Sequence, residues 1–255
     1  MITIITPFYN SRNTFERTFE SVMMQSYRQY MWLIVDDGSC NEQINWLKDL
    51  CKHDERVRVI CNSQSKGAGG ARNTGLLRCN SAFVTFIDSD DTWDPSFLST
   101  VVALLAAGVP AVTAGYRRKD FVGNNLGEFL PRRIVYVDQL SRGCDVSCLS
   151  SAYNLELCRE LPLFGEVRAR NDLYFVYNFL RQGLYILPLP VVLSTYHLGH
   201  SSISSNKFNL VAYMYQFSRF IGHGPVRSIF EVLCWAFYGI RKYWTRYFPN
   251  RLKKS

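Results

Sequence analysis

Apolar and polar positions alternate along the first hundred residues in the pattern of an α/β protein. Short apolar runs rich in β-branched residues predict buried strands. These runs span residues 2–7, 31–35, 57–61 and 82–87. Between them, apolar residues recur at helical spacing, which predicts helices at residues 14–25, 41–52 and 69–78. Strands that alternate with helices in this way indicate a mostly parallel central sheet with helices on both faces.

The second half of the chain is less regular. The apolar run at residues 101–114 is interrupted by Gly108-Val109-Pro110, which predicts a helix, a turn and the start of a buried strand. Further strands are predicted at residues 112–116, 134–137 and 184–193, and further helices at residues 155–161, 173–181 and 229–244.

The predicted elements divide the chain into two parts. We expect an α/β domain over residues 1–205, with one half at residues 1–95 and a second half at residues 96–205. A basic, aromatic helical appendage is expected at residues 206–255.

The net charge of +8 is concentrated at the C-terminal end of the sequence. Residues 219–255 contain eight Lys or Arg residues and one acid, Glu231, so this segment carries +7 of the +8. Basic residues mixed with large aromatic rings are typical of a helix lying on an anionic membrane surface. Packing of this segment against the domain is the alternative. Nucleic-acid binding also uses basic and aromatic residues, but it would give the carboxylates described below no role, so we expect none.

The N-terminus and the cysteines indicate a cytoplasmic protein. The apolar residues 1–6 lack a basic region before them and end at Pro7, unlike a secretory leader. None of the eight cysteines is spaced as a CxxC pair, so reduced thiols are expected. With the basic C-terminal segment, this predicts a cytoplasmic protein on the inner face of the cytoplasmic membrane.

The motif with the clearest chemistry is Asp88-Ser89-Asp90-Asp91, which follows the strand at residues 82–87. Carboxylates gathered at one strand end repel each other unless a cation neutralises them. Hard divalent cations prefer oxygen ligands and also bind diphosphates. One acid could serve as a helix cap after the strand, but three acids favour metal and diphosphate binding.

Two further motifs follow strand ends. Asp36-Asp37-Gly38-Ser39 closes the strand at residues 31–35 and could be a plain turn or a nucleotide contact. Gly69-Gly70-Ala71-Arg72-Asn73 opens a helix, where Arg72 and the helix N-terminus would attract phosphate. A flexible loop with a surface arginine is the alternative. Ligands of open α/β sheets bind outside the carboxyl ends of the strands, so these motifs are expected at one edge.

Together, these motifs form a recognisable series. Pro7-x-Tyr9-Asn10, Val35-Asp36-Asp37-Gly38-Ser39, Gly69-Gly70-Ala71-Arg72-Asn73 and Asp88-Ser89-Asp90-Asp91 resemble the family 2 glycosyltransferases of GT-A fold, as in bacterial surface-polysaccharide synthesis. The similarity is close over residues 1–95 and looser to about residue 204. It implies inverting transfer from a nucleotide-sugar, a UDP-sugar, with Mn²⁺ or Mg²⁺, to a glycan or lipid-linked glycan.

The same resemblance implies roles for individual residues. The nucleoside would be lined by Thr6, Pro7, Tyr9, Asp37 and Arg72. Asp88 and Ser89 would contact the ribose and the diphosphate, while Asp88 and Asp90 would hold the metal.

A carboxylate base is also implied by the resemblance, in a Glu-Asp pair that opens a helix. Here Asp172 occupies that place, but Asn171 stands where the family has Glu. An inverting transfer needs such a base to take the proton of the acceptor hydroxyl. An acid favoured by the helix dipole is the structural alternative for Asp172, and Glu166 is the other candidate base.

The segment from Tyr196 to Ser204 is similar to the family's closing segment. His197 or His200 could contact the diphosphate or the metal, although an ordinary surface histidine is the alternative.

Two other functions fit parts of the sequence. A sugar nucleotidyltransferase would also need carboxylates and a metal but would release diphosphate from a nucleoside triphosphate. A non-enzymatic basic module would bind lipid or nucleic acid whether or not Asp88 and Asp90 were present.

Overall fold

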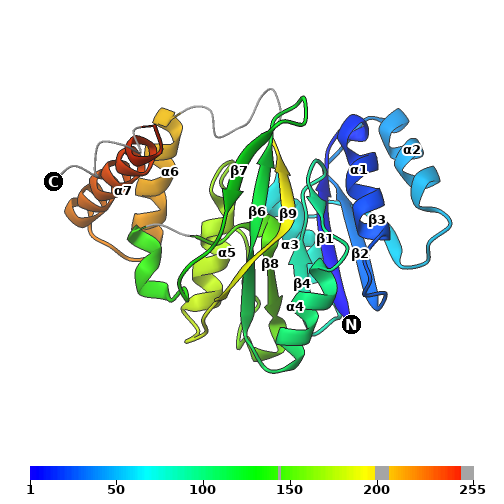
Figure 1. The fold of residues 1–255 in the computed structure, drawn as a ribbon, viewed down its shortest axis with the longest axis horizontal. Helices are drawn as coiled ribbons and strands as arrows, with labels where there is room; N and C mark the ends of the chain where they lie inside the picture. The colour runs from blue at the N-terminus through cyan, green and yellow to red at the C-terminus, as the bar shows by residue number, and fades with distance from the viewer. Residues whose placement is uncertain (143–144, 199–206, 248–255) are drawn as a thin grey trace.

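A computed structural model describes residues 1–142, 145–198 and 207–247 (Figure 1). Within these residues, nine strands form one mixed sheet in the order β3-β2-β1-β4-β8-β6-β9-β5, with β7 pairing with β6. The strands are β1 (Ile2–Phe8), β2 (Tyr30–Asp36), β3 (Val57–Cys61), β4 (Phe83–Phe86), β5 (Thr92–Trp93), β6 (Ala111–Lys119), β7 (Asn125–Phe129), β8 (Ser151–Asn154) and β9 (Leu187–His197).

Strand directions bring several chain segments to one edge of this sheet. Strands β3, β2, β1 and β4 are parallel, as predicted for the first half of the chain. Strand β8 is antiparallel to both β4 and β6, so β6 runs in the same direction as β4. Strand β9 is parallel to β6. The carboxyl ends of β1, β2, β4, β6 and β9 therefore lie at the same edge of the sheet.

Helices cover both faces of the sheet and enclose two cores. They are α1 (Arg12–Met23), α2 (Asn41–Cys51), α3 (Ala68–Leu77), α4 (Phe97–Ala106), α5 (Asn171–Leu180), α6 (Lys207–Phe220) and α7 (Pro225–Tyr247). Because successive strand residues point to opposite faces, Ile4 joins the core under α1, α2 and α4, whereas Ile5 joins the core under α3, α5 and α6.

Helix α3 begins at a close approach between backbone segments. Gly67 precedes it with a φ of +115°, which favours glycine. A Cβ at Gly70 would lie 1.7 Å from the Ser65 carbonyl oxygen, and one at Gly69 would lie 2.8 Å from the Gly165 carbonyl oxygen. The glycines of this motif therefore let α3 pack against the preceding loop and the segment before α5.

Helices α6 and α7 lie at one end of the molecule, beside α5 (Figure 1). The Tyr174 ring of α5 lies 5.3 Å from that of Phe217 and 4.7 Å from that of Phe220, centroid to centroid. The Arg170 guanidinium lies over the Trp235 ring. The first turns of the expected appendage thus pack on the domain. Over the described helices, none has the length and apolar character needed to cross a membrane.

Most differences between the predicted and the observed elements lie in the second half of the chain. Instead of a strand at 134–137, a single bridge joins Val135 to Ile186, and a 3₁₀ turn follows at Val137–Arg142. Instead of a helix at 155–161, one 3₁₀ turn spans Leu155–Leu157. Strands β5, β7 and β8 and the 3₁₀ turn Cys148–Ser150 were not predicted.

The close approach at α3 predicts the effect of one methyl group. Gly70→Ala should lower the free energy of unfolding by about 1–3 kcal/mol, because the Cβ meets backbone that cannot move aside as a side chain could. Thermal and urea unfolding measure this change.

The matched control is Gly224→Ala, where a Cβ has nothing within 4 Å. It should change the free energy of unfolding by at most about 0.5 kcal/mol. Equal stability of the two variants would contradict the packing described at α3.

Candidate active site

The four-residue motif after β4 forms a turn at the carboxyl edge of the sheet. Asp88 and Asp90 are half-buried there, whereas Asp91 is fully buried. The Asp91 Oδ1 accepts a hydrogen bond from the His197 backbone N–H at 2.9 Å. Asp91 therefore attaches the end of β9 to this turn, which leaves Asp88 and Asp90 as the acids available to a ligand.

Arg72 of α3 connects this turn to helix α5. Its guanidinium is buried; Nη2 donates to the Asp88 carboxylate, and Nη1 donates to Asn171 Oδ1 at 3.2 Å. Burial alone would lower the pKa of Arg72, but the neighbouring Asp88 and Asp172 carboxylates raise it. Arg72 is thus a fixed cation beneath the site, and its Nε has no hydrogen-bond partner among the described residues.

The electrostatics of Asp90 differ from those of an ordinary surface acid. Its burial and the nearby Asp88 carboxylate raise its pKa to about 6, against the opposing effect of Arg17. The Arg17 side chain donates from Nε to the Asp90 carbonyl at 3.1 Å. Burial and the three acids of the turn also raise the pKa of the Tyr196 hydroxyl to about 12. The turn therefore concentrates negative charge in partly dehydrated surroundings.

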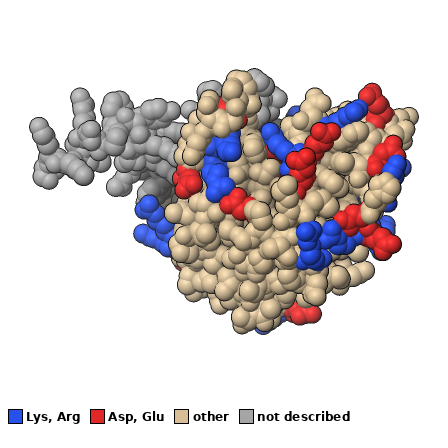
Figure 2. Space-filling model, turned by 45° about the vertical axis from the view of Figure 1, so that its right-hand side comes forward, with Lys and Arg blue, Asp and Glu red and all other residues tan. Residues whose placement is uncertain are grey.

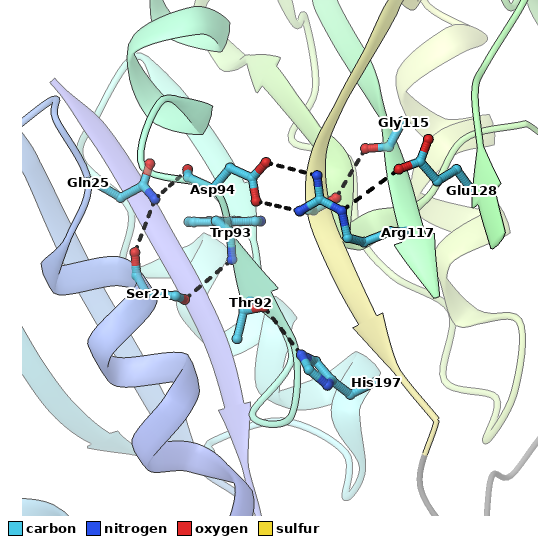
Figure 3. A network of polar contacts seen from close by, with 10 residues as sticks. Ser21, Gln25, Thr92, Trp93, Asp94, Gly115, Arg117, Glu128 and His197 are labelled. Carbon is cyan, nitrogen blue, oxygen red and sulfur yellow. Dashed lines mark hydrogen bonds and ion pairs between the residues drawn. The ribbon is translucent and has the colours of Figure 1, made fainter. Parts of the chain in front are cut away.

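His197 lies at the end of β9 beside the turn (Figure 3). Its Nε2 is 3.3 Å from Thr92 Oγ1, and burial together with Arg17 and Lys119 lowers its pKa to about 4. The ring is consequently uncharged at neutral pH. His200, the other candidate histidine, lies outside the described residues.

A network of polar contacts holds the chain that follows the turn (Figure 3). The Arg117 guanidinium forms two hydrogen bonds with the Asp94 carboxylate, at 2.8 and 3.2 Å. Gln25 donates from Nε2 to the Asp94 carbonyl at 2.9 Å, and the Trp93 N–H donates to Ser21 Oγ at 3.3 Å. These contacts attach the segment after Asp91 to α1 on one side and to β6 on the other.

Asp37 lies at the end of β2 and contacts the loop before α3. Its Oδ2 accepts from the Gly67 N–H at 2.8 Å, and its Oδ1 accepts from Asn62 Nδ2 at 2.6 Å. Its neighbour Asp36 accepts from the Gly38 and Ser39 N–H groups and so stabilises the turn. Asp37 therefore joins the ends of β2 and β3 to the helix that carries Arg72.

The other residues expected at the nucleoside differ in exposure. Tyr9 is exposed, with the Lys66 Nζ 5.4 Å from its ring centroid, and Pro7 is half-buried in β1. Thr6 is fully buried, and its Oγ1 accepts a hydrogen bond from the Trp32 indole at 2.9 Å. Half-buried Ser89 accepts from Thr14 through its carbonyl. Their contacts with a nucleotide remain predictions.

Asp172 lies in the first turn of α5 and is half-buried, next to the Arg72 partner Asn171. Glu166, the other candidate base, is exposed. Cys148, in the 3₁₀ turn before β8, interacts electrostatically with Arg72, Asp88 and Asp172. Burial raises the pKa of its thiol to about 12, so it is uncharged. These shared interactions indicate that Asp88 and Asp172 lie in one neighbourhood.

Three residues of this neighbourhood were not predicted as part of it. Arg17 and Cys148 carry no motif, and only the fold brings them to the carboxyl edge. Asn171 was noted as a departure from the family pattern; its contact with Arg72 gives it a role in holding α5.

The acidic side chains of this site supply some, but not all, of the ligands that a divalent cation needs. Among residues 1–142, 145–198 and 207–247, no group of three or more His, Cys, Asp or Glu side chains is arranged to hold a metal ion. Mg²⁺ in nucleotide enzymes is commonly held by one or two carboxylates together with phosphate oxygens. Asp88 and Asp90 fit that chemistry, because a cation would offset both the burial of Asp90 and its repulsion by Asp88.

Comparison with known proteins places this arrangement in a family. Residues 3–155 match the profile of glycosyl transferase family 2. The chain is 28% identical to the Escherichia coli UDP-Glc:α-D-GlcNAc-diphosphoundecaprenol β-1,3-glucosyltransferase WfgD, over 95% of both proteins. It is 31% identical to the putative teichuronic acid biosynthesis glycosyltransferase TuaG of Bacillus subtilis, over 82% of this chain and 83% of that protein.

A solved structure gives the same result for the fold. The mannosyltransferase PcManGT from Pyrobaculum calidifontis, in complex with GDP-Man and Mn²⁺, superposes with a TM-score of 0.66 at 17% identity and covers 92% of this chain and 69% of its own. The expected GT-A architecture is confirmed. The sequence match and the shared fold agree, and the chain belongs to glycosyl transferase family 2.

Proposed function

We propose that this enzyme transfers a hexosyl group from a UDP-sugar, with inversion, to a sugar on a polyprenyl-diphosphate-linked acceptor in surface-polysaccharide synthesis. The full-length similarity to WfgD, whose name specifies a UDP-glucose donor and a diphosphoundecaprenol-linked acceptor, supports both substrates. The similarity to TuaG supports a role in surface polymers. The likeness to a GDP-mannose enzyme concerns the fold alone and does not specify the base.

One observation carries the proposal: buried Arg72 contacts both Asp88, which would face the donor, and Asn171, which would lie toward the acceptor. Asp172, next to Asn171, is thereby held near the acids that would face the diphosphate. A transferase needs this proximity, because the base takes the proton of the acceptor hydroxyl whose oxygen bonds to the anomeric carbon as the diphosphate leaves that carbon.

A divalent metal, Mn²⁺ or Mg²⁺, would be held by Asp88 and Asp90 with the donor diphosphate. When bound, it would stabilise the negative charge of the departing nucleoside diphosphate. PcManGT, which shares the fold, is in complex with Mn²⁺. Asp88 also neutralises buried Arg72, so Asp90 is the acid that can be changed with less effect on folding.

Asp172 would act as the base. Its carboxylate takes the proton of the acceptor hydroxyl while the hydroxyl oxygen attacks the anomeric carbon from the face opposite UDP. The new glycosidic bond forms as the bond to the diphosphate breaks, and so an α-linked donor gives a β-linked product. The N-terminal turn of α5 favours negative charge at this position.

Asp90→Ala should reduce sugar transfer by at least roughly 100-fold, since metal stabilisation of the leaving group contributes several kcal/mol. It should also remove the stabilisation of the protein by UDP with Mn²⁺ in thermal-shift measurements. The control is Asp49→Asn, which changes an exposed acid of α2. Transfer at the wild-type rate in Asp90→Ala would exclude Asp90 from metal binding.

Asp172→Asn should lower kcat by roughly 10²–10⁴-fold, the usual contribution of a general base. Binding of UDP with Mn²⁺ should stay unchanged, because the amide keeps the size of the carboxylate. Glu166→Gln is the matched control and should keep the wild-type kcat. An inactive Glu166→Gln variant together with an active Asp172→Asn variant would show that Glu166, and not Asp172, is the base.

A panel of nucleotide-sugars and nucleoside triphosphates, each with and without Mn²⁺, separates transfer from nucleotidyl transfer. We expect one UDP-sugar to raise the melting temperature only with metal, and UDP to be released on adding acceptor. Release of diphosphate from a nucleoside triphosphate would favour the nucleotidyltransferase.

A further inference from the structure

Helix α7 has one face packed on the protein and an opposite apolar face that is open. Ser228 and Val232 are buried, and Trp235 packs against the second core. At spacings of three, four and seven residues, which share one side of a helix, four apolar side chains are 55–80% exposed. These four residues, the outer face of α7, are Val226, Ile229, Phe230 and Leu233.

Polar contacts fix the rotation of this helix. Glu231 Oε2 lies 2.8 Å from His223 Nδ1 and accepts from Ser218 Oγ at 2.6 Å. Its Oε1 accepts from Arg227 Nε at 3.2 Å. Turning α7 to bury its outer face would break the contacts of Glu231 with His223 and Ser218, which lie outside α7, and would expose Val232 to water. The outer face is therefore presented outward by the packing of α6 and α7.

The charge distribution favours an anionic partner for the outer face of α7. Residues 219–255 carry +7, whereas the remaining 218 residues carry +1, from 21 Lys or Arg and 20 acids. In the described part of the face drawn in Figure 2, basic side chains lie beside acidic ones, in keeping with this balance. An anionic surface would attract the C-terminal segment, whereas two copies meeting through α7 would bring two segments of +7 together.

We propose that the outer face of α7 is the surface by which the enzyme docks on an anionic lipid bilayer. An amphipathic helix of this kind lies in the interface, with its apolar side chains among the lipids and basic residues near the headgroups. The proposal extends the proposed function, since a polyprenyl-linked acceptor is held in a bilayer, but it can be tested without the reaction.

The test uses the full chain and vesicles of equal parts phosphatidylglycerol and phosphatidylcholine in a co-sedimentation assay. Ile229→Ser combined with Phe230→Ser should bind at least about tenfold more weakly than wild type, because two large apolar side chains leave the interfacial face of the helix. The control combines Met24→Ser with Leu77→Ser, which are similarly exposed apolar residues directly after α1 and at the end of α3, and should bind as wild type.

Stabilisation by UDP with Mn²⁺, measured on the same samples, should be the same in all three proteins, which shows that the variants fold. Wild-type binding by the α7 variant would overturn the proposal. So would a wild-type dimer in vesicle-free buffer that the α7 variant dissociates, since the outer face would then join two copies. If the wild-type chain bound vesicles but transferred no sugar, the docking surface would be supported and only the proposed function would be rejected.

Discussion

The buried guanidinium of Arg72 is the constraint on which the rest of the site depends. A cation removed from water is tolerated only when partners compensate it, and removing one partner of such a pair costs of the order of a few kcal/mol. Here Asp88 supplies the opposite charge and Asn171 a second acceptor. Because these partners belong to different halves of the chain, compensating Arg72 also fixes how the end of β4 meets the start of α5. Glycines 69 and 70 allow α3 to come close enough for this contact.

The three acids of the turn after β4 consequently differ in role. Asp88 neutralises Arg72, and Asp91 is buried against the backbone of β9. Burial and neighbouring acids raise the pKa of both Asp90 and Asp91, but Asp91 is fully buried whereas Asp90 is half-buried, so a cation could reach the Asp90 carboxylate. The three similar acids of one motif therefore differ in burial and in their partners. These differences explain how one motif can stabilise the fold at this edge of the sheet and also leave a carboxylate accessible to a ligand.

Most of the first half of the fold could be predicted from the sequence, because β1, β2 and β4 are mainly apolar runs that are buried on both faces. The second half could not, since its elements are short and are defined by contacts. Asn154 caps only one turn before Cys158, and exposed Leu157 has no core to extend that turn into a helix. Strand β8 has four residues and is specified by its pairing with β4 and β6. Its recognition requires partners distant in the sequence.

The motifs predicted the edge of the sheet where the site lies, but not the contacts within it. Because side chains alternate between the two faces of β1, Thr6 lies on the same face as Ile4. There its hydroxyl accepts a hydrogen bond from the Trp32 indole. Arg72, expected at the nucleoside, is buried and donates to Asp88, so the alternative of a surface arginine is wrong. Cys148 has no sequence signal at all, and only folding brings it beside Arg72 and Asp172. The residue types of the motifs indicated which ligands the site could bind. Which of their side-chain atoms remain accessible to a ligand depends on burial, which the sequence did not predict.

We propose that Arg72 holds Asp88, Asp90 and Asp172 in the positions that sugar transfer requires. The most direct measurement is the affinity for UDP with Mn²⁺ and the kcat of transfer in Arg72→Lys, after thermal unfolding has shown that the variant is folded. Lysine keeps the charge but lacks the planar fork that reaches two acceptors. Both the affinity and kcat should fall, each by about tenfold or more, because losing a hydrogen bond to a charged group costs about 1.5–3 kcal/mol. Unchanged kcat and unchanged affinity in a folded Arg72→Lys protein would contradict this proposal.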